Sequence, residues 1–249
     1  MNKRHTEILE LLAKQKKAEV KDLSDLLGVS QVTIRKDLIA LEKQGLIERS
    51  HGYASLNESD DLNNRLAYHY DLKQQIARIA IEDVEDGETI MIESGSCCAL
   101  VALEIAQTRK DITLITNSAF IADFVRKENI KIILLGGEYQ NESQVSVGPI
   151  TRKCVEAFFV DKLYIGADGF TQTTGFTNTD YMRAETVKDM AKQAAHVIVV
   201  TESEKFEKKG VVNLIGMDQV SLVVTDANIP VDTEKFLKSK AIEVKKVES

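Results

Sequence analysis

The sequence predicts an α/β protein in two parts, a small mostly helical head and a larger domain built on a mostly parallel sheet. In the first 56 residues, apolar side chains recur every three to four positions, the period of an amphipathic helix. From Gly87 onward, short β-branched runs alternate with helical stretches, the pattern of a parallel sheet covered by helices. Residues 57–64 are polar and lack periodicity, so we expect a linker between the two parts.

The composition indicates a globular chain whose charge is unevenly distributed. The 249 residues are 43% hydrophobic, which is enough for a sizeable core. The net charge is −7, yet residues 1–56 carry 10 basic and 8 acidic side chains, and the remainder carries 22 basic and 31 acidic ones. A nucleic acid would therefore meet the head, because phosphates would repel the acidic remainder.

No stretch indicates export or a membrane. There is no apolar run of the signal-peptide kind, and none approaches the roughly 18 residues of a membrane span, so a cytoplasmic location is expected. Cys97, Cys98 and Cys154 are odd in number and match no zinc-site spacing, which favours reduced thiols and predicts no metal.

The head is predicted to carry a turn followed by a helix that ends near Gly45. Gly28 suits the left-handed backbone of a short turn, and Ser30 can cap the helix that follows. We expect the buried stripe of that helix to consist of Val32, Ile34, Leu38 and Leu41. Its N-terminal half then exposes hydroxyl, amide and cationic groups, as in a helix that meets base edges and phosphates.

Two helices before this segment and a hairpin after it complete a winged helix-turn-helix. Apolar periodicity predicts the helices at 2–14 and 19–27, and residues 46–56 alternate around a glycine as a two-stranded wing. A lone cationic helix is more often a solvated face, but three levels of pattern agree here. The predicted DNA-contacting residues are Ser30, Gln31, Thr33, Arg35, Lys36, Arg49 and His51.

The second part is predicted as a mostly parallel, Rossmann-like α/β domain. Residues 65–84 are expected to form one helix, on which Arg65 and Lys73 either face a hinge or are simply solvated. The predicted domains are 1–56, a connection at 57–75, and 76–249. Strands are expected at 89–93, 112–116, 130–135, 162–166, 196–201, 220–225 and 242–245, and helices at 97–107, 118–127, 149–157, 183–195 and 232–238.

Polar or glycine-bearing turns follow the predicted strands, where parallel sheets bind ligands. A ligand with phosphate and hydroxyl groups suits these turns, although each one alone could be a plain turn or a surface charge. Glu185 and Lys188 lie three residues apart and could simply pair on a helix surface. The predicted effector-binding residues are Ser94, Gly95, Ser96, Thr116, Asn117, Gly136, Gly137, Asp168, Gly169 and Lys205.

With both parts considered, the chain resembles the DeoR family of transcriptional regulators over nearly its full length. Residues 29–54 are close to that family's DNA-binding signature, and the second part resembles its sensor domain, with a fold similar to ribose-5-phosphate isomerase. The resemblance implies that the sensor domain binds a phosphorylated sugar. The chain departs from the family's pattern at several residues. Cys97 and Cys98 replace threonines in the phosphate loop, Tyr53 replaces a glycine in the wing, and Glu202 and Glu204 stand where Asp and Ser are common.

The resulting hypothesis is a repressor of a sugar-utilisation operon. Its expected partners are double-stranded operator DNA, a phosphorylated sugar and further copies of itself, as a homodimer or homotetramer, with no cofactor. Two alternatives stay open at this point. One is a sugar-phosphate isomerase fused to a DNA-binding domain, and the other is an activator or a regulator whose ligand acts as co-repressor.

Overall fold

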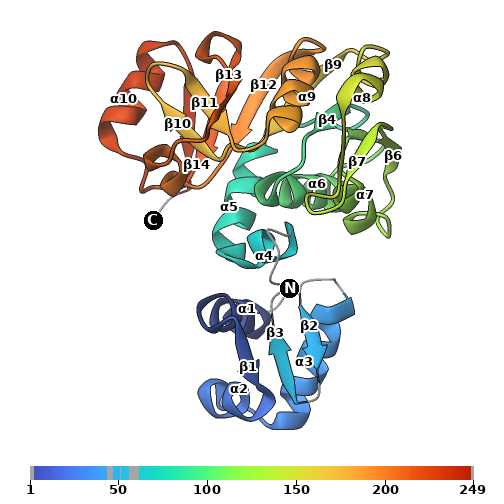
Figure 1. Cartoon of the computed structure of the whole chain (residues 1–249), viewed down its shortest axis with the longest axis vertical. Coiled ribbons are helices and arrows are strands. Elements are labelled where there is room, and N and C mark those ends of the chain that lie inside the picture. Colours follow the sequence, from blue (N-terminus) through green and yellow to red (C-terminus); the bar gives the residue numbers. More distant parts are fainter. Residues whose placement is uncertain (1–2, 44–46, 51, 56–61, 248–249) are drawn as a thin grey trace. The chain divides into compact units, whose positions relative to one another are not determined.

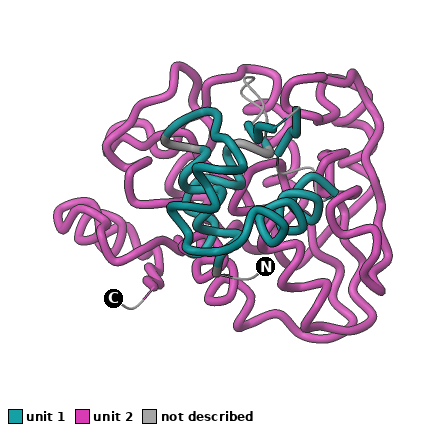
Figure 2. Tube along the Cα trace, turned by 90° about the horizontal axis from the view of Figure 1, so that it is seen from below, with its two compact units in different colours: residues 1–71 teal, residues 72–249 magenta. Residues whose placement is uncertain are grey.

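The computed structural model describes residues 3–43, 47–50, 52–55 and 62–247, and the chain divides into two compact units, residues 1–71 and 72–249 (Figures 1 and 2). The division falls within the stretch 57–75 that was predicted to connect two domains. Each unit has its own hydrophobic core, and each is described by itself below.

Unit 1 is a helix-turn-helix with a small antiparallel sheet of order β1-β3-β2. Ala18 of β1 pairs with Ala54 of β3, so the predicted two-stranded wing gains a third strand. Three residues are too few to show a period in the sequence, which is why β1 was not predicted. The elements are α1 (Lys3–Gln15), β1 (Lys17–Glu19), α2 (Val20–Leu27), α3 (Gln31–Lys43), β2 (Glu48–Ser50), β3 (Tyr53–Ser55) and α4 (Leu62–Ala67).

The turn before α3 has the predicted geometry. Gly28 lies at φ 64°, in the left-handed region, and the Thr33 backbone N–H donates to Ser30 Oγ at 3.2 Å. The predicted stop at Gly45 lies outside the described residues.

The buried stripe of α3 is Ile34, Asp37, Leu38 and Leu41, so the prediction that Val32 is buried is wrong. Val32 is 60% exposed. Successive residues turn by about 100° around a helix, so Val32 and the fully buried Ile34 point in nearly opposite directions. Asp37, which was not predicted to be buried, is the fourth residue of the buried stripe.

The single helix predicted at 65–84 is also wrong, because α4 ends at Ala67 and α5 (Tyr70–Ala80) begins after a break. His69 adopts a left-handed backbone with φ 52°, which interrupts the helical hydrogen bonding. The predicted linker is too long as well, since α4 starts at Leu62 and Leu62 is 3% exposed.

Unit 2 contains the predicted parallel sheet, with the order β15-β14-β12-β9-β4-β5-β6. All seven predicted strands are present, and no strand end differs from its predicted position by more than two residues. Figure 1 shows this sheet with helices packed beside it. They are β4 (Thr89–Ile92), β5 (Thr113–Thr116), β6 (Lys131–Leu134), β9 (Val160–Ile165), β12 (Ala194–Val200), β14 (Leu222–Thr225) and β15 (Glu243–Lys246).

The predicted helices of unit 2 are also present, with α6 buried almost all round. They are α6 (Ser96–Thr108), α7 (Ala119–Phe124), α8 (Gly148–Val155), α9 (Tyr181–Ala191) and α10 (Val231–Ser239). None of the helices in the described part of the chain is long and apolar enough to cross a membrane.

Five short antiparallel strands were not predicted. They form the hairpin β7-β8 and the sheet β10-β11-β13, and each is only three or four residues long. Two short 3₁₀ turns, η1 (Ser203–Glu207) and η2 (Met217–Gln219), follow β12 and β13. The strands are β7 (Glu138–Gln140), β8 (Val145–Val147), β10 (Gly169–Thr171), β11 (Gly175–Asn178) and β13 (Val212–Ile215).

Candidate nucleic-acid interface and sheet-edge site

The N-terminal half of α3 presents polar and cationic side chains to solvent. Gln31, Arg35 and Lys36 are exposed, and Arg35 Nη2 donates to Gln31 Oε1 at 3.4 Å. Ser30 and Thr33 are engaged with each other, because their hydroxyl oxygens lie 2.9 Å apart in addition to the cap. The two hydroxyls therefore hold the start of the helix, while the Gln31 amide and the two cations are exposed where a ligand could contact them.

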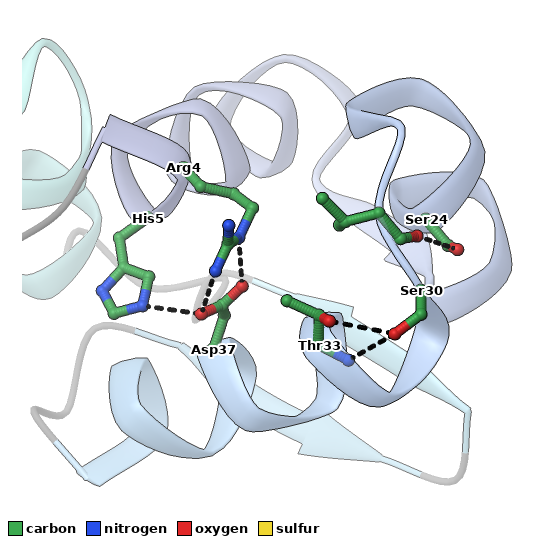
Figure 3. A network of polar contacts seen from close by, with 7 residues as sticks. Arg4, His5, Ser24, Ser30, Thr33 and Asp37 are labelled. Atoms are coloured by element: carbon green, nitrogen blue, oxygen red, sulfur yellow. Dashed lines mark hydrogen bonds and ion pairs between the residues drawn. The ribbon is translucent and has the colours of Figure 1, made fainter.

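Behind this face, a buried carboxylate ties α3 to α1 (Figure 3). Arg4 Nε donates to Asp37 Oδ2 at 2.6 Å and Nη2 donates to Oδ1 at 3.2 Å, while His5 Nε2 lies 3.1 Å from Oδ1. Burial alone would raise the pKa of Asp37, but the hydrogen bonds from Arg4 and His5 outweigh it and lower that pKa below its usual value. The carboxylate therefore fixes the orientation of α3 on α1.

Replacing Asp37 by asparagine is expected to lower the stability of unit 1 by about 1–2 kcal/mol at neutral pH, because the charge-assisted bonds to Arg4 weaken. A carboxyl with a lowered folded-state pKa contributes stability above its unfolded pKa of about 3.9, and this contribution is lost as the pH falls through the folded value. Hydrogen exchange of the α1 and α3 amides, corrected for intrinsic rates, measures the effect between pH 7 and pH 3.

The control is Asp25→Asn, the same chemical change at an exposed position of α2. We expect Asp25→Asn to leave the protection of α1 and α3 unchanged at every pH. Equal protection in the Asp37→Asn and wild-type proteins at pH 7 would contradict the role assigned to this carboxylate.

Of the two wing residues that were predicted to contact DNA, the structure describes Arg49. Arg49 Nε lies 3.5 Å from Glu42 Oε2 on α3, and its side chain is 33% exposed. Tyr53 donates its hydroxyl to Glu19 Oε1 at 2.8 Å, and the Lys17 ammonium lies 4.1 Å from the centroid of its ring. His51 lies outside the described residues. Arg49 is thus held beside α3, and Tyr53 is held against β1.

In unit 2, the predicted turns lie at one edge of the sheet. Those after β9, β4, β5 and β6 follow four adjacent parallel strands, and Lys205 follows β12, the next strand along. Because parallel strands end at the same edge, the sheet brings these segments to the side where such folds bind ligands.

The loop after β4 is organised around Glu93, which sequence reasoning did not single out. This carboxylate is 4% exposed, accepts from the Ser94 hydroxyl at 2.7 Å and accepts from the Gly166 backbone N–H at 3.3 Å. A charged residue at the end of an apolar strand was the available signal. The contact joins the ends of β4 and β9 and turns the Ser94 hydroxyl toward Glu93, which leaves the backbone at Gly95 and Ser96 to open α6.

Thr116 and Asn117 are buried at the end of β5. The Thr116 hydroxyl accepts from the Ser118 backbone N–H at 3.1 Å, and Asn117 Nδ2 donates to the Ser146 carbonyl at 3.0 Å. Asn117 Oδ1 has no hydrogen-bond partner among the residues that the structure describes. A buried acceptor in this state is costly unless a water or a ligand satisfies it.

Asp168 and Lys205 lie on neighbouring loops at this edge. Asp168 Oδ2 accepts from the backbone N–H and hydroxyl of Thr179, and Lys205 Nζ lies 3.4 Å from Glu204 Oε1. Gly169 packs against the loop of Lys205, since a Cβ there would lie 2.5 Å from the Lys208 carbonyl oxygen. Gly169 therefore acts through close packing, whereas Asp168 and Lys205 carry the charges.

One of the two glycines after β6 also serves packing. A Cβ on Gly137 would lie 1.8 Å from Thr151 Oγ1 and 2.7 Å from the Val147 carbonyl oxygen, so only glycine fits beneath α8. Gly136 is exposed and has open space beside it. Both glycines are exposed, and Gly137 is the one that packing requires.

A groove of about 210 Å³ lies between α8 and α9 and includes none of the predicted effector residues. Glu185 lines it and accepts from Lys188 Nζ at 2.7 Å, which confirms the predicted helix-surface pair. The lining residues are Gly148, Pro149, Arg152, Tyr181, Met182, Glu185, Thr186 and Asp189.

Both parts of the chain match families of known proteins. Residues 4–60 match the DeoR-like helix-turn-helix domain, and residues 68–227 match the DeoR C terminal sensor domain. The second match alone covers more than half of the chain.

Relatives match over nearly the whole chain. The putative aga operon transcriptional repressor of Escherichia coli O157:H7 is 28% identical over 250 residues, 98% of this chain and 93% of that protein. The glycerol-3-phosphate regulon repressor of Escherichia coli strain K12 is 30% identical over 245 residues, 97% of each chain. Among solved structures, ribose 5-phosphate isomerase A of Methanocaldococcus jannaschii is similar over 55% of each chain, with 20% identity and a TM-score of 0.41. That last likeness is too distant to carry over any activity.

Proposed function

The chain belongs to the DeoR family of transcriptional regulators, and from this premise we propose that it represses a sugar-utilisation operon in response to a phosphorylated sugar. Unit 1 binds operator DNA in the cytoplasm, and the carboxyl edge of the seven-stranded sheet in unit 2 binds the effector. We propose a regulator and not an enzyme, because both bacterial relatives are named as repressors.

The observation that carries the DNA-binding part is the exposed amide and cationic face at the start of α3. Gln31, Arg35 and Lys36 project from the N-terminal turns of the helix, where a helix-turn-helix protein contacts bases and phosphates. Asp37 supports this face from behind through Arg4. A helix anchored in this way presents its side chains in one orientation, which sequence-specific binding requires.

The effector site is supported by the groups at the sheet edge. The Gly95 and Ser96 backbone opens the 13-residue helix α6, whose N-terminus favours a phosphate. Lys205 adds a cation, and Asp168 and Asn117 Oδ1 can accept from sugar hydroxyls. The buried thiols of Cys97 and Cys98 follow directly in α6, so the loop offers fewer hydroxyl donors than the usual family pattern.

We further propose that the functional form is a homodimer or homotetramer on a two-fold or repeated operator, because one winged helix contacts little DNA. The effector changes repression only if it binds one arrangement of the oligomer more tightly than the other.

The test is a gel-shift titration of the full-length protein on DNA upstream of the neighbouring operon, at several salt concentrations. Pentose, hexose and polyol phosphates are added in turn, with the parent sugars and inorganic phosphate as controls. We expect salt-dependent, sequence-specific binding that one sugar phosphate shifts. Binding without preference over random DNA, or binding that ignores salt, would contradict the proposal.

Lys205→Ala is expected to raise the sugar-phosphate concentration needed for the shift by about ten- to a hundredfold, because a charge-assisted hydrogen bond to phosphate is lost. DNA affinity without effector should not change. Lys208→Ala removes the same charge from a more exposed position of the same loop and is the matched control. An equal response in the Lys205→Ala and Lys208→Ala proteins would exclude Lys205 from the effector site.

A further inference from the structure

We propose that Val32 is a specificity-determining residue that contacts the 5-methyl group of a thymine in the major groove of the operator. The inference rests on the proposed function, since it names the base chemistry that α3 recognises. It begins from the finding that Val32 is 60% exposed, although its residue type favours a core position.

Val32 lies on the face of α3 that carries the cations. Residues three and four apart share a helix face, so Val32, Arg35, Lys36 and Ile39 form one stripe. All four are exposed, Ile39 to 41%. Val32 is the second residue of the helix, within the N-terminal turns that enter the groove in this class of protein.

Val32 is surrounded by polar side chains but can itself make only apolar contacts. Ser30 and Thr33 are bonded to each other at the cap, and Gln31 accepts a hydrogen bond from Arg35. A valine side chain has no donor or acceptor, so it cannot distinguish bases by hydrogen bonding. The 5-methyl of thymine is the apolar group on the major-groove edge, and contacts with it discriminate thymine from the other bases.

An exposed apolar side chain is not by itself a site, because many proteins carry single exposed valines. Leu26 provides the comparison, since it is exposed to nearly the same degree, 59%, but lies on α2 and not on α3, the proposed DNA-contacting helix. If exposure alone mattered, both residues would behave alike. If placement on the cationic stripe matters, only Val32 will respond to the thymine methyl.

The experiment removes the two contacting groups separately. Full-length protein first selects sites from random duplex DNA, and each thymine of the selected site is then replaced singly by deoxyuridine, which lacks only the methyl group. We expect wild-type affinity to fall about fourfold at one thymine position per half-site, as estimated for one buried methyl. Val32→Ala should weaken binding to the thymine duplex and lose discrimination at that position alone. Alanine is the best helix former, so this variant keeps α3 intact.

The results for Leu26→Ala and Val32→Ala distinguish a failure of the Val32 contact from a failure of the repressor function. Leu26→Ala should retain the full thymine preference at every position. Sequence-specific binding in which Val32→Ala still discriminates at every thymine, or in which no deoxyuridine substitution affects the wild type, would overturn the role of Val32 and leave the repressor proposal standing. Failure to select any sequence would overturn the proposed function, and this inference with it.

Discussion

Replacing Arg35 and Lys36 together by alanine is expected to lower operator affinity by about a hundredfold, the largest effect of any surface substitution proposed for this protein. A lost cationic contact to a base edge costs about 1–3 kcal/mol, and a lost phosphate contact weakens binding to all sequences. Both side chains are exposed on α3, so their removal does not open the core. Titrations over a range of salt should also show a slope of log affinity against log salt reduced by about one for each phosphate contact that is lost.

The control is Lys127→Ala with Lys131→Ala, which removes the same charge from exposed positions in unit 2. We expect this variant to bind the operator like the wild type. Circular dichroism should show native helix content in both variants. A protein that keeps its operator affinity without Arg35 and Lys36 would place the DNA interface elsewhere.

The sequence predicted the cap and turn of α3 well but assigned its buried stripe only in part. Gly28 and Ser30 act locally, so their residue types are sufficient to identify the turn. The buried position of Asp37 depends on Arg4, which lies 33 residues away. Val32 faces outward because Ile34, which points in nearly the opposite direction, is buried. A local hydrophobic period cannot reveal a charged residue whose burial is stabilised by another helix.

In unit 2, the strands of the parallel sheet were predictable because buried strands read as continuous β-branched runs. The short antiparallel strands were not, since Gly175–Asn178 is a strand through its pairing with two other short segments, Gly169–Thr171 and Val212–Ile215. The break at His69 was not predictable either. Residues 65–84 include no proline or glycine, so the local sequence carried no signal that the helix is interrupted.

The candidate sheet-edge site was predicted from one rule, that loops after parallel strands share an edge. The rule identified the loops that carry Ser94, Asp168 and Lys205, but not the inward groups that shape them. Glu93 organises the first loop through its hydrogen bond with Ser94. Lys73 was predicted either to face a hinge or to be solvated, but it is 1% exposed. Buried charges follow from a partner in the fold, and partners distant in sequence leave no local pattern.

Lys73→Met is expected to lower the stability of unit 2 by about 3–5 kcal/mol. Lys73 Nζ lies 3.3 Å from Glu202 Oε2, and the two side chains are only 2% and 5% exposed. Methionine fills most of the volume but leaves the Glu202 carboxylate buried without this ammonium group, which is strongly unfavourable in a low-dielectric interior. Scanning calorimetry should show the midpoint of unit 2 lowered by roughly 6–20 °C. Because Glu202 directly precedes η1, which carries Lys205, effector affinity should fall as well.

Two further variants test whether burial of the charge is the cause. Lys188→Met removes the ammonium from the Glu185 pair, which is shorter at 2.7 Å but 35% and 43% exposed, and should cost no more than about 1 kcal/mol. Adding Glu202→Gln to Lys73→Met removes the buried carboxylate charge and should recover more than half of the loss, a coupling that a double-mutant cycle measures. If Lys73→Met costs no more than Lys188→Met, or if Glu202→Gln brings no recovery, the buried pair does not anchor α5 to the end of β12. Distance alone would rank the two pairs in the opposite order, so the comparison shows directly whether burial decides their contributions.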